Sequence, residues 1–214
     1  MVRLKWALAS GIFTWALLLA FTPSANANVL VNGSFESSTA DLAITSMPGW
    51  AITLGNVDVL GPDFDGTQAA PGQGSQLIDL VGTCPRCTTI EQTFSTTPGQ
   101  TYIFDAWLSH HPALLRGNAD VSLNGVPFVH LAHFGTVTPE DQNWAPFSAS
   151  FVALASSTTL TITDTTDLYD CGGIYLDGLS VSTVPEPATL ALLGVGVAGL
   201  AGITWRRRPL AYGR

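Results

Sequence analysis

Two side chains on one side of an alternating segment have the chemistry of a sugar-binding surface. Within residues 101–109, Trp107 and Asp105 fall on the side opposite the apolar positions. An exposed ring can stack on a pyranose while a carboxylate accepts hydrogen bonds from hydroxyl groups, because ligand sites combine apolar surface with a few placed polar groups. Trp50, Trp144 and Tyr169 are further candidates. Core or edge packing is the alternative for each ring.

The four histidines form two close pairs, His110-His111 and His130-x-x-His133. If the pairs met in the fold, they could hold Zn²⁺ or Cu²⁺ in a site controlled by pH near 6.5. The spacing supplies no third defined type of ligand, and His130 and His133 on one strand would point to opposite faces. We therefore expect loop histidines rather than a metal site.

The three cysteines allow one disulfide with one thiol left over. Cys84-Pro85-Arg86-Cys87 has the spacing of a redox dithiol, but no helix or βαβ unit surrounds it. A zinc ribbon would need a fourth ligand. We expect Cys171 to bridge to Cys84 or Cys87, because that bridge closes the longer loop, and a Cys84–Cys87 bridge stays open as the alternative.

The net charge of the central segment and the enzyme motifs that the chain lacks exclude some classes of protein. Residues 28–184 carry 15 acids against two arginines and no lysine, a net charge of −13. Such a surface repels phosphate, which excludes nucleic-acid binding. The chain has no Gly-x-Ser-x-Gly, no His-Glu-x-x-His and no phosphate-cradling glycine loop, so we expect no enzyme. Paired carboxylates for glycoside hydrolysis stay open, since 15 acids can be paired in many ways.

Both ends of the chain have the composition of targeting segments. Arg3 and Lys5 precede an apolar run over residues 6–21, and the small-x-small triplet at 25–27 completes a secretory signal peptide over residues 1–27. Residues 188–205 contain no charge and precede three arginines, Arg206, Arg207 and Arg208. This pattern predicts a transmembrane helix whose C-terminal end and 209–214 tail are cytoplasmic, so that the domain faces outward.

The segment between these ends has the period-two alternation of an all-β domain. Apolar residues alternate in short runs separated by Gly, Pro, Asn or Asp, and no helix of two turns is convincing. About ten strands at this spacing predict a β-sandwich. Strands are expected near 29–31, 50–54, 57–60, 76–80, 90–95, 101–109, 119–123, 127–131, 147–153, 158–163 and 174–181. Asn124-Gly125 predicts a tight hairpin, and alternation puts Tyr102, Phe104, Ala106 and Leu108 in the core.

The C-terminal segment resembles the PEP-CTERM sorting signal of exopolysaccharide-producing Gram-negative bacteria. The tripeptide Pro185-Glu186-Pro187, the apolar span and the arginine cluster occur in the expected order over residues 184–208. The resemblance implies a membrane-bound sorting enzyme that cuts near the tripeptide, after anchoring in the inner membrane facing the periplasm. The mature 28–184 domain would then reach the cell surface or extracellular matrix.

The domain itself resembles the choice-of-anchor C family, which is related to plant cell-wall proteins of the domain-of-unknown-function 642 class. The match rests on an ordered series of motifs from Asn28-Val29-Leu30-Val31-Asn32-Gly33-Ser34-Phe35-Glu36 to Ile174-Tyr175-Leu176-Asp177-Gly178-Leu179-Ser180-Val181. It implies a galactose-binding-like jelly roll, the architecture of many carbohydrate-binding modules. The run Trp107-Leu108-Ser109-His110-His111 departs from the small, Asn-containing stretch common in the family, so no ligand contact transfers to it.

The same resemblance implies a structural Ca²⁺ held by Glu36 and Asp177, whose strands pair in jelly-roll carbohydrate modules. Two hard carboxylates with nearby carbonyls suit the six to eight oxygen ligands of calcium. The alternative is that both carboxylates cap turns by accepting backbone amides.

These observations favour an exported, noncatalytic module that binds carbohydrate, with the organism's own exopolysaccharide as the expected partner. A structural or adhesive matrix protein with protein partners is the alternative. A polysaccharide-modifying hydrolase is the third hypothesis.

Overall fold

The computed structural model describes residues 27–64, 67–82, 88–166 and 172–184. These residues form strands and turns, without a helix. The strands are β1 (Asp41–Ile44), β2 (Ala51–Leu54), β3 (Val57–Leu60), β4 (Leu77–Asp79), β5 (Thr89–Ser95), β6 (Thr101–His110), β7 (Arg116–Leu123), β8 (Val126–Phe134), β9 (Ala145–Val152), β10 (Ser157–Asp164) and β11 (Ile174–Thr183). Residues 27–184 form one compact unit.

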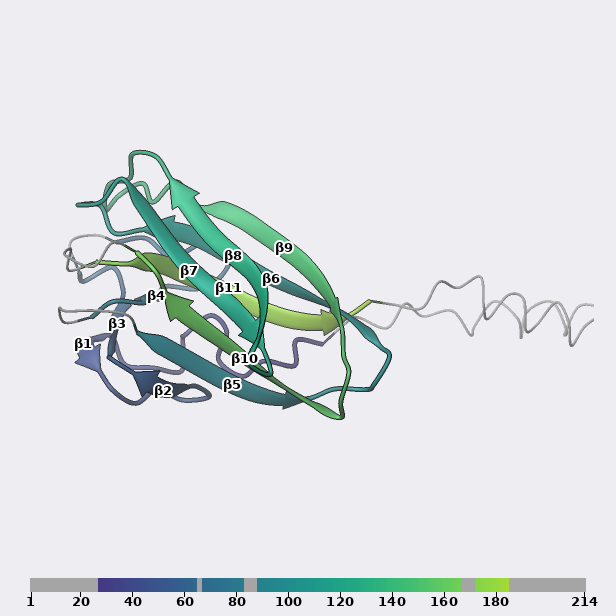
Figure 1. The fold of residues 1–214 in the computed structure, drawn as a ribbon. Coiled ribbons are helices and arrows are strands. Elements are labelled where there is room, and N and C mark those ends of the chain that lie inside the picture. The colour runs from purple at the N-terminus through teal and green to yellow at the C-terminus, as the bar shows by residue number, and fades with distance from the viewer. Residues whose placement is uncertain (1–26, 65–66, 83–87, 167–171, 185–214) are drawn as a thin grey trace, which may run out of the picture. The chain divides into compact units, whose positions relative to one another are not determined.

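The strands form two antiparallel sheets packed face to face, the jelly-roll sandwich predicted from the sequence (Figure 1). The first, the β6 sheet, has the order β1-β3-β4-β11-β6-β9. The second, the β10 sheet, has the order β2-β5-β10-β7-β8. The central neighbours β11 and β6 come from distant parts of the chain, so the β6 sheet forms only when residues 101–110 meet residues 174–183.

Strict alternation along β6 separates a core face from an outer face. Tyr102, Phe104, Ala106 and Leu108 are at most 3% exposed, as predicted, and they face the other sheet. Leu160 and Ile162 of β10 meet them in the same core. Each such fully buried side chain contributes about 1.5–3 kcal/mol of transfer free energy, so the alternating positions hold the two layers together.

The predicted tight hairpin is present between β7 and β8. Asn124 and Gly125 have φ angles of 51° and 78°, the left-handed conformation that a type I′ turn requires at both central residues. Leu123 and Val126 pair across the turn.

The first strand and the first motif differ from the prediction. β1 was not predicted, because it is a four-residue edge strand with an irregular register to β3 and a positive φ of 56° at Ala43. Residues 29–31 do not form a strand: Val29 bonds to the Val181 carbonyl, and the Asn28 side chain bridges to Leu179 and Val181. The segment therefore lies beside β11 without a ladder of its own.

Several predictions concern residues outside the described ranges. These are residues 1–26 of the leader, Tyr169, Cys84, Cys87 and Cys171, the tripeptide Pro185-Glu186-Pro187 and the 188–205 span with Arg206, Arg207, Arg208 and the 209–214 tail. Where the structure does describe the chain, no helix is long and apolar enough to cross a membrane.

Candidate functional site

The outer face of the β6 sheet brings Trp107 and Asp105 together with polar groups from both neighbouring strands. Trp107 lies opposite Pro146 of β9 and Asp177 of β11. One row further along β6, Asp105 lies opposite Ser148 and Ser180, and the Ser180 hydroxyl is 3.5 Å from Asp105 Oδ2. Because side chains two residues apart share a face, the strand register itself places an indole beside a carboxylate flanked by two hydroxyl groups.

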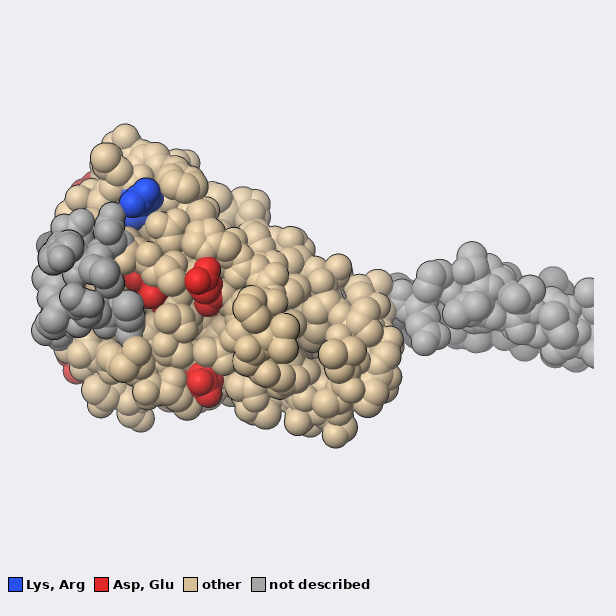
Figure 2. Space-filling model, in the orientation of Figure 1, with Lys and Arg blue, Asp and Glu red and all other residues tan. Residues whose placement is uncertain are grey.

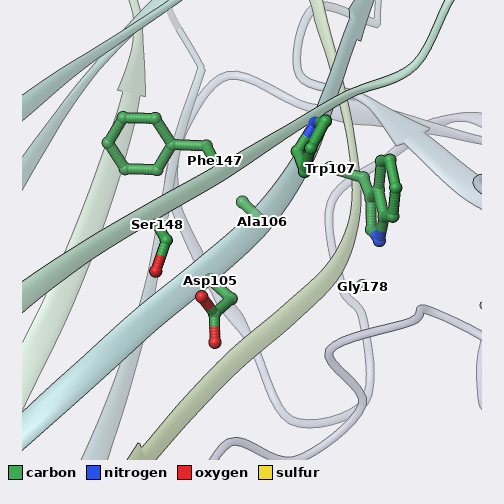
Figure 3. A pocket seen from close by; sticks show the side chains of 7 residues that line it. Asp105, Ala106, Trp107, Phe147, Ser148 and Gly178 are labelled. Atoms are coloured by element: carbon green, nitrogen blue, oxygen red, sulfur yellow. The ribbon is translucent and has the colours of Figure 1, made fainter.

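Trp107, Asp105, Pro146 and Ser148 line a pocket of about 310 Å³ (Figure 3), and Ser180 lies beside it across the strand from Asp105. In Figure 3 the Asp105 carboxylate and the Ser148 hydroxyl point to the same side, and the Trp107 indole lies next to Gly178. The Phe147 ring points away from them and contacts Phe104 in the core. The residues that line the pocket are Asp105, Ala106, Trp107, Pro146, Phe147, Ser148 and Gly178.

An irregularity in β11 forms one wall of this pocket. The register between β11 and β6 shifts between Asp177 and Ser180, and Gly178 has a φ of 57°. A Cβ atom at Gly178 would lie 2.7 Å from the Gln73 carboxamide. Glycine is favoured here because this backbone conformation is strained for a residue with a Cβ, and a Cβ would also displace the end of the Gln73 side chain.

Asp177 lies behind Gly178 and is fully buried. Its Oδ2 accepts the Ala70 N–H at 2.9 Å, and its Oδ1 accepts the Gly178 N–H at 2.6 Å. Burial raises the pKa of Asp177 to about 7, the two backbone donors oppose that rise, and the negative charge of Glu36 adds to it. This carboxylate therefore ties the 67–76 loop to the bulge.

Glu36 holds the same loop from another side. Its Oε1 accepts the backbone N–H groups of Ser75 at 2.7 Å and Gln76 at 2.6 Å, and its Oε2 accepts the Ser75 hydroxyl at 3.1 Å. Glu36 and Asp177 thus cap backbone amides, which is the alternative that the sequence left open.

The same two carboxylates retain capacity for a cation. A carboxylate has about four acceptor positions, and the contacts above occupy two on Asp177 and three on Glu36. The Gln73 carboxamide approaches the same bulge, so a carboxylate and carboxamide oxygen set is present, which is the donor chemistry that Ca²⁺ prefers. In the described part of the chain no three His, Cys, Asp or Glu side chains gather to hold a metal, so carbonyl, carboxamide or water oxygens would have to complete the shell.

The other predicted aromatic residues lie elsewhere. Trp50 is 5% exposed, packs near Phe35 and donates its indole N–H to the Asn32 carbonyl, so it is a core residue and not a stacking surface. Trp144 is half-buried, donates to the Gln68 carbonyl at 3.1 Å and packs against a small outer cluster of Leu60, Leu77, Tyr175 and Phe64. It therefore supports the 67–76 loop rather than lining the pocket.

The histidines differ from the loop positions that the sequence predicted. Three lie in strands, because β6 extends through His110 and β8 through His133. His130 is exposed and lies 2.6 Å from Asp120 Oδ1, on the face opposite buried His133, as the spacing predicted. His111 follows β6 and packs edge-on against Tyr175.

His110 and His133, one from each pair in the sequence, contact each other in the interior. His110 Nδ1 and His133 Nδ1 are 2.8 Å apart, and His133 Nε2 lies 2.9 Å from the Asn143 carbonyl, which only accepts. His133 therefore carries its proton on Nε2, and His110 donates from Nδ1. The His110 Nε2 lone pair has no partner among the described residues. Burial lowers the pKa of both rings, so the neutral pair is favoured.

Two buried carboxylates were not predicted from the sequence. Asp79 accepts the N–H groups of Val81 and Gly173, and Asp164 accepts those of Thr166 and Ile174. Burial raises the pKa of both, that of Asp79 well above its usual range. Each aspartate is the last residue of its strand and accepts the backbone N–H two residues later, a local pattern that the sequence can predict. That both carboxylates lie next to Gly173 depends on the tertiary structure.

Solved structures with this fold include binding modules and an enzyme. The xylan-binding CBM22-1 domain of Paenibacillus barcinonensis Xyn10C is 17% identical with a TM-score of 0.51, covering 78% of this chain and 100% of that one. TmCBM61 in complex with β-1,4-galactotriose is 14% identical with a TM-score of 0.52, covering 74% and 99%. The Stig cyclase Fisc from Fischerella sp. TAU is 13% identical with a TM-score of 0.53, covering 76% and 100%. At these identities the likeness shows the fold alone.

In sequence comparisons the chain matches a curated protein, a sorting motif and a protein family. The chain is 29% identical over 200 residues to halomucin of Haloquadratum walsbyi, covering 86% of this chain and about 2% of that much longer protein. Residues 183–208 match the PEP-CTERM protein-sorting motif, which implies export and sorting to the cell surface. Residues 28–181, most of the chain, match the family described as protein of unknown function (DUF642), and the chain belongs to that family.

Proposed function

We propose that this protein is an exported, noncatalytic carbohydrate-binding module whose site is the Trp107 pocket. The observation that carries the proposal is the row of Ser148, Asp105 and Ser180 beside the Trp107 indole. A ring can stack on the apolar face of a sugar, while the carboxylate and hydroxyl oxygens accept and donate hydrogen bonds to its hydroxyl groups. The pocket is at the small end of the usual range of about 300–1,000 Å³, which suits one or two sugar rings.

The comparisons support this proposal at the level of fold and location. Two neighbours of the same fold are carbohydrate-binding modules, and the sorting motif implies export, which brings the domain to where envelope and matrix polysaccharides are. The Fischerella cyclase shares the fold as well, so the pocket residues rather than the fold support binding. The matrix exopolysaccharide of the producing cell is the partner that we propose.

The decisive variant is Trp107→Ala, assayed by affinity electrophoresis and calorimetry against a panel of polysaccharides and oligosaccharides. Removal of the ring should weaken binding at least about tenfold, the effect of losing about 1.4 kcal/mol of stacking. Phe134→Ala is the matched control, because Phe134 is an exposed ring, 63% accessible, on β8 of the other sheet. Its removal should leave binding unchanged.

Three outcomes would contradict the proposal. If the native chain binds no glycan, the domain is a structural or adhesive matrix protein with protein partners. If Trp107→Ala binds as well as the native chain, the pocket is not the site. If the glycan is shortened or modified during the assay, with the activity lost on neutralising a carboxylate, the protein is a hydrolase.

We also propose that Glu36 and Asp177 hold a structural Ca²⁺. The cation would neutralise a fully buried carboxylate and its neighbour, which otherwise repel each other. Binding to the folded state alone must raise the melting temperature, so millimolar Ca²⁺ should stabilise the native chain and chelator should reverse the effect. A melting temperature that responds to neither, at pH 7.5, would show that the two carboxylates act only as backbone caps.

A further inference from the structure

No Lys or Arg among the described residues lines the Trp107 pocket, which contains the Asp105 carboxylate. Asp105 is half-buried at the centre of the pocket, and its protein contact is a 3.5 Å approach by the Ser180 hydroxyl. Arg116 is the only Lys or Arg among the described residues, and it begins β7 in the other sheet. Within the described ranges the Asp105 carboxylate thus has no basic partner, and it can pair with a cation brought by the ligand.

Building on the proposed function, we propose that the pocket selects glycans that carry a free, protonated amino group, such as a deacetylated amino sugar. The amine would lie between the Asp105 carboxylate and the Trp107 ring. The sugar ring to which it is attached would occupy the remaining space beside Pro146 and Gly178.

The acceptors in the pocket, together with Ser180 beside it, match the three donors of an ammonium ion. Asp105 offers a charged acceptor, and the Ser148 and Ser180 hydroxyl groups on either side of it offer neutral ones. A hydrogen bond between two charged groups is about twice as strong as a neutral one. The face of an indole ring adds a cation–π attraction that a neutral hydroxyl group lacks.

The surrounding charge acts in the same direction. Residues 28–184 carry a net charge of −13, and acidic side chains occur at several separate places on the face that Figure 2 shows. A uronic acid or a sulfated sugar would bring a like charge to an uncompensated carboxylate, which costs free energy. The site is therefore unsuited to acidic polysaccharides.

The test compares short glucosamine oligomers with their N-acetylated counterparts of the same length, by calorimetry on the purified full-length chain in 0.15 M salt at pH 6. The native chain should bind the glucosamine oligomer about tenfold more tightly, because acetylation removes the charge-assisted hydrogen bond to Asp105. Asp105→Asn should reduce this preference to about twofold or less, because the amide removes the charged acceptor for the ammonium group.

A control separates the pocket from general attraction of a polycation. Asp120→Asn changes the net charge of the protein by the same amount, at an exposed position on β7 of the β10 sheet. It should keep the preference for the amine. If it lowers the preference as much as Asp105→Asn does, long-range charge explains the effect and the inference is wrong.

The remaining outcomes distinguish the inference from the function on which it rests. Equal binding of both oligomers, or tighter binding of neutral or acidic ones, would overturn the preference for an amine while Trp107 still identifies a sugar site. Absence of binding to every oligomer and polysaccharide would overturn both.

Discussion

The two outer faces of the sandwich enclose the same core but differ in their chemistry. The outer face of the β10 sheet, which we call the threonine face, presents regular threonine pairs. The hydroxyl oxygens are 3.0 Å apart in Thr89 and Thr163 and 2.8 Å apart in Thr93 and Thr159. The β6 sheet presents Trp107, Asp105 and a bulge at Gly178. The first face uses its polar groups within its own ladder, whereas the second leaves an indole and a carboxylate in a pocket. The irregular face is therefore the one on which the proposed site lies.

The largest difference should come from Asp177, which has no counterpart on the threonine face. Its pKa is about 7 in the folded chain and near 3.9 when unfolded, so the folded state holds a proton that the unfolded state releases. Through this group stability is greatest at low pH and falls as the pH rises from about 4 to 7, by up to ~4 kcal/mol. With chelator present, urea unfolding of the native chain and of Asp177→Asn across this range should show a fall that is steeper in the native chain by this amount.

Other titrating groups do not obscure that comparison, because they are common to both proteins. Asp79 and Asp164 act in the same direction as Asp177, while the lowered pKa values of His110 and His133 remove stability as the pH falls below 6.5. Parallel stability profiles for the native chain and Asp177→Asn would contradict the role given to the buried carboxylate.

The bulge can be tested with two glycines of similar backbone conformation. Gly178 and Gly125 both have positive φ, but a Cβ meets the Gln73 carboxamide at Gly178 and nothing within 4 Å at Gly125. Gly125→Ala should cost about 1–2 kcal/mol for the left-handed conformation. Gly178→Ala should cost slightly more, because the end of the Gln73 side chain must move away from the new Cβ, and it should weaken glycan binding as well. Equal costs in thermal unfolding would mean that the 67–76 loop adapts freely.

The smallest effect is expected on the threonine face. Thr93→Val removes one hydroxyl from an exposed pair with Thr159, and cross-strand pairs of this kind contribute about 0.2–1 kcal/mol. We expect a loss of stability within that range and unchanged glycan affinity. A clear loss of affinity would show that the β10 sheet takes part in recognition.

The features that could be predicted from the sequence are those that depend on the alternation of residues within one strand or hairpin. The faces of β6, the Asn124-Gly125 turn and ten of the strands follow from period two and turn chemistry, and Trp107 with Asp105 was placed on the correct outer face. These features need only the residues of one strand or hairpin, because neighbouring side chains on a strand alternate between faces.

What the sequence did not predict depends on contacts between distant segments. The shift at Gly178 becomes visible only when β11 pairs with β6 and the loop at 67–76 covers it. The burial of Trp50 and the contact between His110 and His133 likewise require the tertiary structure. The β1 strand was missed because its short sequence carries a positive φ at Ala43 instead of a regular pattern.

A crystal structure of the protein with a bound oligosaccharide tests the central claim most directly. We expect a sugar ring stacked on the Trp107 indole, with its polar groups within hydrogen-bond distance of Asp105, Ser148 or Ser180. Density for the sugar on the threonine face of the β10 sheet, with the Trp107 pocket empty, would contradict the account.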